Sequence, residues 1–188
     1  MAHFLLAAGR LSEISVSTTE ASTKTSLPTE SDKHHKPANI YLSKDVLSKF
    51  DKTLTTKKCV VLQGPPGTGK TLLANNLSRQ FVGKDGEIAS IQFHAGFSYD
   101  DFVQGWRPTA TGFELIEGHF MEFCDRAASN PKERFLLLID EINRGNVSSI
   151  FGECFSLIEA TKRGPENAIH LAYREPGSGF CEFYVPQN

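Results

Sequence analysis

The chain has 188 residues, of which 39% are hydrophobic, and its formal net charge is −2 at pH 7. This length fits one globular domain with a tail, and the near-neutral charge argues against a strongly basic nucleic-acid surface. The sequence has no apolar run of the roughly 18 residues that a membrane span needs, so we expect no membrane association. The four cysteines lack the paired spacing of a zinc site or a disulfide framework, which favours a reduced, cytoplasmic setting.

The first 38 residues have the composition of a tail. Between Ser12 and Ser31, eleven of twenty residues are Ser or Thr. Such a segment cannot bury enough apolar surface to offset the entropy lost on ordering it. We therefore predict a disordered linker or tail over residues 1–38 and a folded domain over residues 39–188.

The folded domain begins with an amphipathic helix that follows Tyr41, and Ser43 is its candidate N-cap. A short apolar strand is predicted over residues 58–62, and a helix over residues 70–81. A glycine-rich loop joins the two. Strand, glycine loop and helix form the context in which a phosphate-binding loop occurs.

The loop matches the phosphate-binding pattern G-x-x-x-x-G-K-[ST]. It consists of Gly64, Pro65, Pro66, Gly67, Thr68, Gly69, Lys70 and Thr71. Its glycines allow backbone N–H groups to converge on phosphate oxygens, and the helix that follows adds the positive end of its dipole. Lys70 is predicted to contact the β- and γ-phosphates, and the Thr71 hydroxyl to bind Mg²⁺. The sequence therefore predicts a nucleoside triphosphate as ligand.

Strands and helices alternate through the rest of the domain. The further predicted elements are a strand over 88–94, a short capped helix from Ser98, a short strand over 113–116, a helix over 120–128, a strand over 135–140, a helix over 147–158, and a hairpin of strands over 169–173 and 180–184. This alternation predicts an α/β domain with a parallel sheet.

An acidic pair, Asp140 and Glu141, ends the apolar strand over 135–140. Ligands of open α/β sheets bind at the carboxyl ends of the strands, so both carboxylates are predicted to face the phosphate loop. Asp140 is the candidate Mg²⁺ ligand, and Glu141 the candidate group that orients the attacking water. An acidic pair can also simply end a strand at the surface, but here a complete phosphate loop precedes it.

The stretch from Leu137 to Asn146 resembles the Walker B region of the McrB family, the AAA+ GTPase motors of modified-cytosine restriction systems. Further segments agree with that family: residues 93–94, 98–108, 151–153, 162–164 and 183–186. The resemblance implies a P-loop NTPase (AAA+) three-layer sandwich, a hexameric ring and a preference for GTP. It also implies an McrC-like nuclease partner, through which the complex acts on DNA.

Several roles stay open at this point. The Asn-Lys-x-Asp pattern that reads guanine in small G proteins is absent, so GTP rather than ATP rests on the resemblance alone. An ATPase of the dynein-related or MoxR type and a hydrolysis-deficient nucleotide-binding fragment are the alternatives. Asn143 and Arg144 are candidate catalytic neighbours, or else a helix cap and a solvated arginine. Trp106 and Arg107 are either functional or ordinary packing and surface charge.

Compared with the family, the sequence stops before a sensor strand, an arginine finger and a helical lid. We therefore expect a C-terminally incomplete sheet, with a gap between the strands over 58–62 and 135–140. The backbone groups that face this gap would be unpaired. On this basis the 188-residue chain is expected to bind nucleotide weakly and to hydrolyse it barely.

Overall fold

The computed structural model describes residues 2–7, 43–175, 177, 179 and 181–188. The helices are α1 (Lys44–Lys57), α2 (Lys70–Val82), α3 (Tyr99–Phe102), α4 (His119–Ser129) and α5 (Val147–Phe151), with 3₁₀ turns η1 (Ile142–Arg144), η2 (Gly152–Ile158), η3 (Ala160–Lys162) and η4 (Pro165–Asn167). The strands are β1 (Ala2–Ala7), β2 (Cys59–Leu62), β3 (Glu87–Gln92), β4 (Gln104–Thr109), β5 (Gly112–Glu117), β6 (Phe135–Asp140), β7 (Ile169–His170) and β8 (Glu182–Phe183). None of the helices described here is long and apolar enough to cross a membrane.

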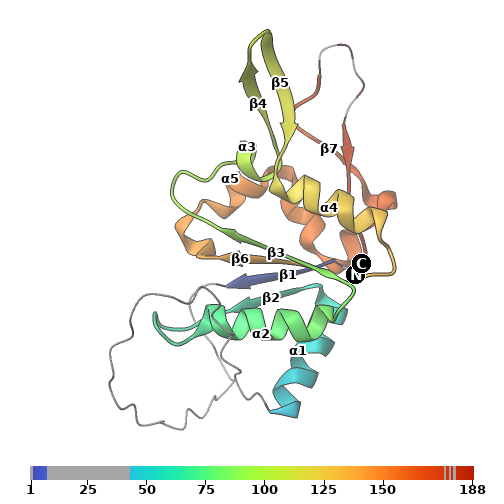
Figure 1. Cartoon of the computed structure of the whole chain (residues 1–188). Helices are drawn as coiled ribbons and strands as arrows, with labels where there is room; N and C mark the ends of the chain where they lie inside the picture. Colours follow the sequence, from blue (N-terminus) through green and yellow to red (C-terminus); the bar gives the residue numbers. More distant parts are fainter. Residues whose placement is uncertain (1, 8–42, 176, 178, 180) are drawn as a thin grey trace, which may run out of the picture.

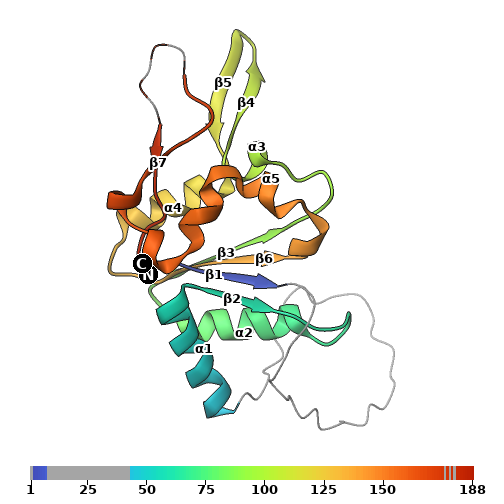
Figure 2. The ribbon, with the colours of Figure 1, turned by 180° about the vertical axis from the view of Figure 1, so that it is seen from behind.

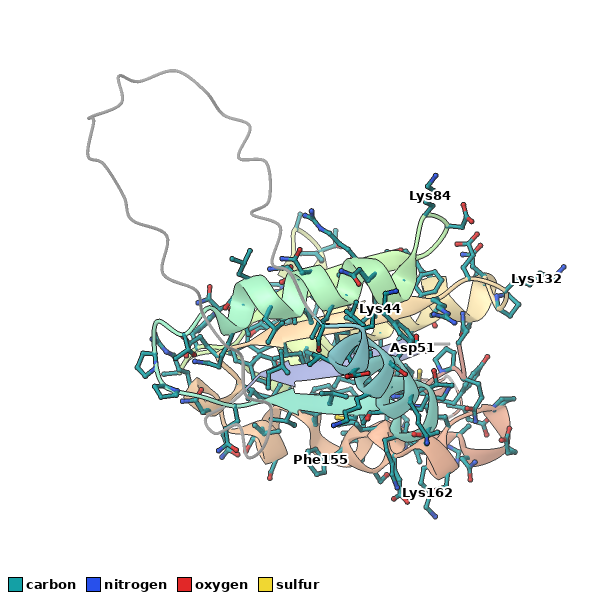
Figure 3. The ribbon with its side chains drawn as sticks, turned by 90° about the horizontal axis from the view of Figure 1, so that it is seen from below. Lys44, Asp51, Lys84, Lys132, Phe155 and Lys162 are labelled. Atoms are coloured by element: carbon teal, nitrogen blue, oxygen red, sulfur yellow. The ribbon has the colours of Figure 1, made fainter. Side chains whose placement is uncertain are left out.

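A parallel sheet with the strand order β2-β1-β6-β3 forms the middle layer. Helices α1 and α2 cover one face, and α4, α5 and η2 cover the other (Figures 1 and 2). Viewed from below, α1 and α2 lie across the first of these faces (Figure 3). The predicted α/β three-layer sandwich with a parallel sheet is thus confirmed.

Strand β6 connects the two hydrophobic cores, because its side chains alternate between the faces of the sheet. Phe135, Leu137 and Ile139 join the core under α4 and α5, whereas Leu136 and Leu138 join the core under α1 and α2. All five are at most 2% exposed. A strand buried on both faces needs a continuous apolar run, which is why the sequence pattern identified it.

The expected gap beside β6 is occupied. Strand β1 runs parallel to both neighbours, with Leu5 opposite Val60 of β2 and Leu138 of β6. The prediction of a tail over 1–38 is therefore wrong for residues 2–7, and so is the prediction of unpaired edges between β2 and β6. The expectation of weak nucleotide binding and hydrolysis rested on those edges and loses that support. Residues 8–38, the rest of the predicted tail, lie outside the described part of the chain.

Most other elements lie where the sequence predicted them, with three differences. Helix α1 is capped as expected, since the Ser43 hydroxyl accepts a hydrogen bond from the Val46 N–H at 3.3 Å. Strand β4 was missed, and it pairs with β5 in a hairpin that projects from the body (Figure 1). The predicted helix over 147–158 changes to a 3₁₀ turn at Gly152, where φ is +51°. The strands β7 and β8 are shorter than predicted.

Lys58, which follows α1, is a charged side chain buried at the amino end of the sheet. It is 6% exposed, and its Nζ donates to the Gln187 carbonyl at 3.1 Å. Burial, with the nearby Arg163 and Arg134 cations, lowers the pKa of Lys58 from 10.5 to about 8. Between pH 8 and 10.5, Lys58 is therefore protonated in more of the unfolded chains than of the folded chains. The free energy of unfolding rises as the pH rises through this window.

We expect the Lys58→Met variant to lack this gain. Its unfolding free energy, measured by urea titration at several pH values, is compared with that of the parent. The parent should become more stable relative to the variant between pH 8 and 10. The cysteine thiols also titrate in this range, but they are the same in both proteins, so their contribution to the unfolding free energy cancels in the difference. A difference that is flat over the range would contradict the lowered pKa.

Candidate nucleotide-binding site

The loop between β2 and α2 has the backbone conformation that a phosphate-binding loop requires. Gly67 and Gly69 have φ angles of +77° and +75°. An added Cβ at either position would meet no atom within 4 Å, so the constraint is the left-handed backbone rather than space. Gly69 is also the N-cap of α2, so the free N–H groups of the first helical turn face the loop.

Lys70 lies across this loop. Its Nζ donates to the carbonyl oxygens of Gly64 at 2.9 Å and Pro65 at 2.7 Å. The Thr68 hydroxyl donates to the same Pro65 carbonyl at 2.8 Å. These bonds hold the lysine ammonium inside the curve of the loop, close to where the N–H groups of α2 begin.

The two acidic residues follow β6 at the carboxyl edge of the sheet. The Thr71 hydroxyl donates to Asp140 Oδ2 at 3.0 Å, and the Glu141 N–H donates to Asp140 Oδ1 at 2.9 Å. The sequence interval between Thr71 and Asp140 is 69 residues. The fold therefore joins the end of the phosphate loop to the end of the acidic strand, and the shared metal stays a prediction.

A hydroxyl and a carboxylate form a suitable pair for Mg²⁺, which prefers oxygen ligands and usually keeps phosphate oxygens and waters as the rest of its shell. Among the described residues no group of three or more His, Cys, Asp or Glu side chains could hold a metal. Thr71 and Asp140 thus fit a metal whose coordination is completed by nucleotide and water, and they do not fit a cage made entirely of protein ligands.

A cavity of about 630 Å³ opens beside these residues. It is lined by Gly64, Pro66, Gly67, Gly69, Lys70, Thr71, Leu72, Asp140, Glu141 and Asn143. This volume lies within the range of small-molecule and cofactor sites. Leu72 was not predicted as a lining residue. Its position in the first turn of α2, directly after the phosphate loop, could have indicated it.

Glu141 has an unusual backbone, with φ +53° and ψ +36°. Apart from Lys58, it is the one non-glycine residue of the described chain with a positive φ. Its carboxylate pairs with the Arg144 guanidinium, with 3.1 Å between Nε and Oε2. Left-handed backbone at a non-glycine residue is costly and gathers at functional sites, which fits the role predicted for Glu141.

The other residues that the sequence singled out lie elsewhere. Trp106 and Arg107 belong to the β4–β5 hairpin, and Arg107 forms a surface ion pair with Asp101 at 2.7 Å. Burial raises the pKa of the Cys124 thiol well above its usual value and that of Cys154 to about 12, so both thiols stay protonated as small apolar groups. The structure therefore gathers the predicted loop, Asp140, Glu141 and Asn143 around one cavity, and their chemical roles stay predictions.

Known proteins resemble this chain. The family model of the AAA domain (dynein-related subfamily) matches residues 59–185. The "Type IV methyl-directed restriction enzyme EcoKMcrB subunit" of Escherichia coli (strain K12) is 40% identical over 152 residues, which are 80% of this chain and 33% of the relative. The "Type II restriction enzyme BsuMI component YdiS" of Bacillus subtilis (strain 168) is 24% identical over 148 residues, covering 64% of this chain and 43% of the relative.

More distant likeness extends to the mouse protein "Neuron navigator 1", which is 22% identical over 165 residues that make up 8% of its length. The chain spans less than half the length of each of these relatives. The family match covers the phosphate loop, the acidic strand and the segments between and after them. The chain belongs to the dynein-related subfamily of AAA domains, and is similar to the McrB subunit of a restriction enzyme.

Proposed function

We propose that this chain binds and hydrolyses a nucleoside triphosphate with Mg²⁺, with GTP as the preferred substrate, as the motor part of a DNA restriction complex. The observation that carries this proposal is the contact between Thr71 and Asp140 at 3.0 Å. It places the phosphate loop and the acidic strand around one cavity, where phosphoryl transfer needs mainly positioning and charge neutralisation.

Each residue has a defined task in this proposal. The N–H groups of the loop and of the start of α2 bind phosphate oxygens, and Lys70 leaves the Gly64 and Pro65 carbonyls to contact the β- and γ-phosphates. Thr71 and Asp140 would hold Mg²⁺, which would supply charge neutralisation at the transferred phosphate. Glu141 accepts a hydrogen bond from the attacking water and orients it. Asn143 lines the same cavity and is proposed to support this water.

The test is the release of phosphate from GTP by the parent chain and by the Glu141→Gln variant. The variant keeps the size of the side chain but cannot accept the proton, so turnover should fall by about 100-fold or more, within the range that general-base catalysis contributes. The affinity for a fluorescent GTP analogue should stay within about twofold. Equal turnover in parent and variant would contradict the role of Glu141.

The choice of base is tested separately, since it is supported by the resemblance to the restriction subunit and by no motif. GTP and ATP are each titrated, in separate experiments, against a fluorescent nucleotide bound at the site. We expect GTP to displace it at lower concentration than ATP. Preference for ATP would favour the second candidate, an ATPase of the dynein-related or MoxR type, which the subfamily match accommodates equally well.

The proposed assembly is a hexameric ring that works with an McrC-like nuclease and reaches DNA through the complex. The resemblance to the Escherichia coli and Bacillus subtilis restriction components supports this part of the proposal. Sedimentation of the chain with and without GTP is the direct measurement. A nucleotide-dependent hexamer is expected, and a monomer at all nucleotide concentrations would contradict a ring made by this chain.

A further inference from the structure

Arg144 lies at the end of a short turn that is firmly attached to the core. The turn η1 begins after Glu141, and the Arg144 N–H donates to the Glu141 carbonyl at 2.8 Å. Ile142 is 7% exposed. A Cβ on Gly145 would lie 2.6 Å from Ile150 Cδ1, so the backbone fits closely against the core there. Side chains can therefore move at this turn more readily than the backbone can.

Within this turn, Arg144 holds the carboxylate of Glu141. Residues three apart eclipse in a 3₁₀ turn, which brings the two side chains side by side. The Arg144 Nε donates to Glu141 Oε2 at 3.1 Å. Glu141 lines the nucleotide cavity, whereas Arg144 is outside the set of described residues that line it. The guanidinium thus engages the carboxylate from the rim of the cavity.

We propose that Arg144 is a positioning residue that restrains Glu141, and that Glu141 must leave Arg144 before it orients the attacking water. This inference rests on the proposed function of the site. A carboxylate acts on a water only when an oxygen is within hydrogen-bond reach and has a free lone pair in that direction. The contact with Arg144 occupies one oxygen and fixes the direction of the other.

The restraint is weak enough to be released. The Arg144 side chain is 63% exposed and the Glu141 side chain 36% exposed. Exposed ion pairs are held only weakly, so a bound nucleotide with its water can compete for Glu141. Of the three guanidinium nitrogens, Nε alone has a partner among the described residues, which leaves the terminal nitrogens of Arg144 free to meet an acidic side chain of another chain. Such a carboxylate would release Glu141 without a movement of the backbone.

The first test compares phosphate release from GTP by the parent, Arg144→Ala and Arg144→Lys. Removing a restraint of this strength should raise the turnover number about two- to fivefold, with KM and nucleotide affinity unchanged. Lysine, which lacks Nε, should give an intermediate value. The matched control is Arg126→Ala, which removes a surface arginine paired with Glu87 at the opposite edge of the sheet. Turnover that falls or stays equal in Arg144→Ala overturns the proposal.

A second measurement tests the restraint of Glu141 by Arg144 without relying on turnover. Absence of turnover in the parent would count against the proposed function and not against the restraint. The NMR signal of the Arg144 Nε–H reports its exchange with solvent. We expect slow exchange in the parent, faster exchange in Glu141→Ala, and faster exchange in the parent when Mg²⁺ and a non-hydrolysable GTP analogue are added. Exchange that is the same in all three samples overturns the restraint.

Discussion

Replacement of Lys70 by alanine is expected to weaken the binding of Mg²⁺–GTP by about 10- to 100-fold. A hydrogen bond to a charged group contributes about 1.5–3 kcal/mol, and about 1.4 kcal/mol corresponds to a factor of ten in affinity. Among the residues that the structure describes, the ammonium donates to two carbonyl oxygens of its own loop and to no other group. Because these carbonyls can be solvated instead, the variant should fold normally. Titration calorimetry measures the loss of affinity.

The matched control is Lys84→Ala, which makes the same change of charge in the turn between α2 and β3. Lys84 extends away from the body of the molecule (Figure 3). Its removal should leave the affinity unchanged within about twofold, since charges this exposed are screened by salt. Equal losses in Lys70→Ala and Lys84→Ala would show that overall charge, rather than the loop, determines nucleotide binding.

Replacement of Leu5 by proline is expected to destabilise the whole domain, because β1 is a central strand. Every backbone N–H of such a strand belongs to one of its two ladders, and proline has none. The partner carbonyl left unsatisfied costs about 1–3 kcal/mol. For a domain of this size that lowers the melting temperature by roughly 2–12 °C at about 2–4 °C per kcal/mol. The melting temperature of parent and variant is compared by differential scanning calorimetry.

The control for this experiment is Leu5→Val, which keeps the backbone N–H and has a high strand propensity. It should melt close to the parent. Leu5→Pro should also reduce nucleotide affinity, because β1 separates the strands that carry the phosphate loop and the acidic pair. A proline variant that melts and binds like the parent would contradict the placement of β1 between β2 and β6.

The sequence predicted those parts of the fold whose pattern is local. The apolar run of β6 ends in Asp140, and a strand buried on both faces has no other pattern. Helix α1 follows Ser43, whose hydroxyl caps it. The phosphate-binding pattern is eight residues long, so it located the glycine loop between β2 and α2 without further information. Each of these signals is contained within a short window of the chain.

The larger difference arises where the structure depends on distant contacts. Strand β1 depends on pairing with β2 and β6, at least 52 residues away, and its six residues precede a Ser/Thr-rich stretch that has the composition of a tail. Strand β4 contains Pro108, which argues against a central strand but is compatible with a two-stranded hairpin. The pairing of β1 leaves no local pattern, whereas the β4–β5 hairpin is local and Pro108 obscured it.

The site was predictable in composition but not in arrangement. The contact between Thr71 and Asp140 depends on the order of the strands, and the ion pair between Glu141 and Arg144 depends on a 3₁₀ turn with a left-handed residue at its start. Sequence spacing named Arg144 as a candidate and left a solvated arginine as the alternative. Only the geometry indicates which carboxylate it contacts.

In the proposed function, the phosphate loop and the acidic strand hold one Mg²⁺–nucleotide together. A double-mutant cycle on Thr71→Val and Asp140→Asn tests it most directly, because both changes preserve the size of the side chain. Affinity for GTP is measured in the parent, the two single variants and the double variant, with Mg²⁺ and with EDTA.

If the two residues share the metal, each single variant loses most of the gain in affinity that Mg²⁺ provides, and the double variant is no weaker than the weaker single variant. With EDTA the four proteins should bind GTP nearly equally. Losses that simply add in Mg²⁺, or that persist unchanged in EDTA, would show that Thr71 and Asp140 do not share a metal.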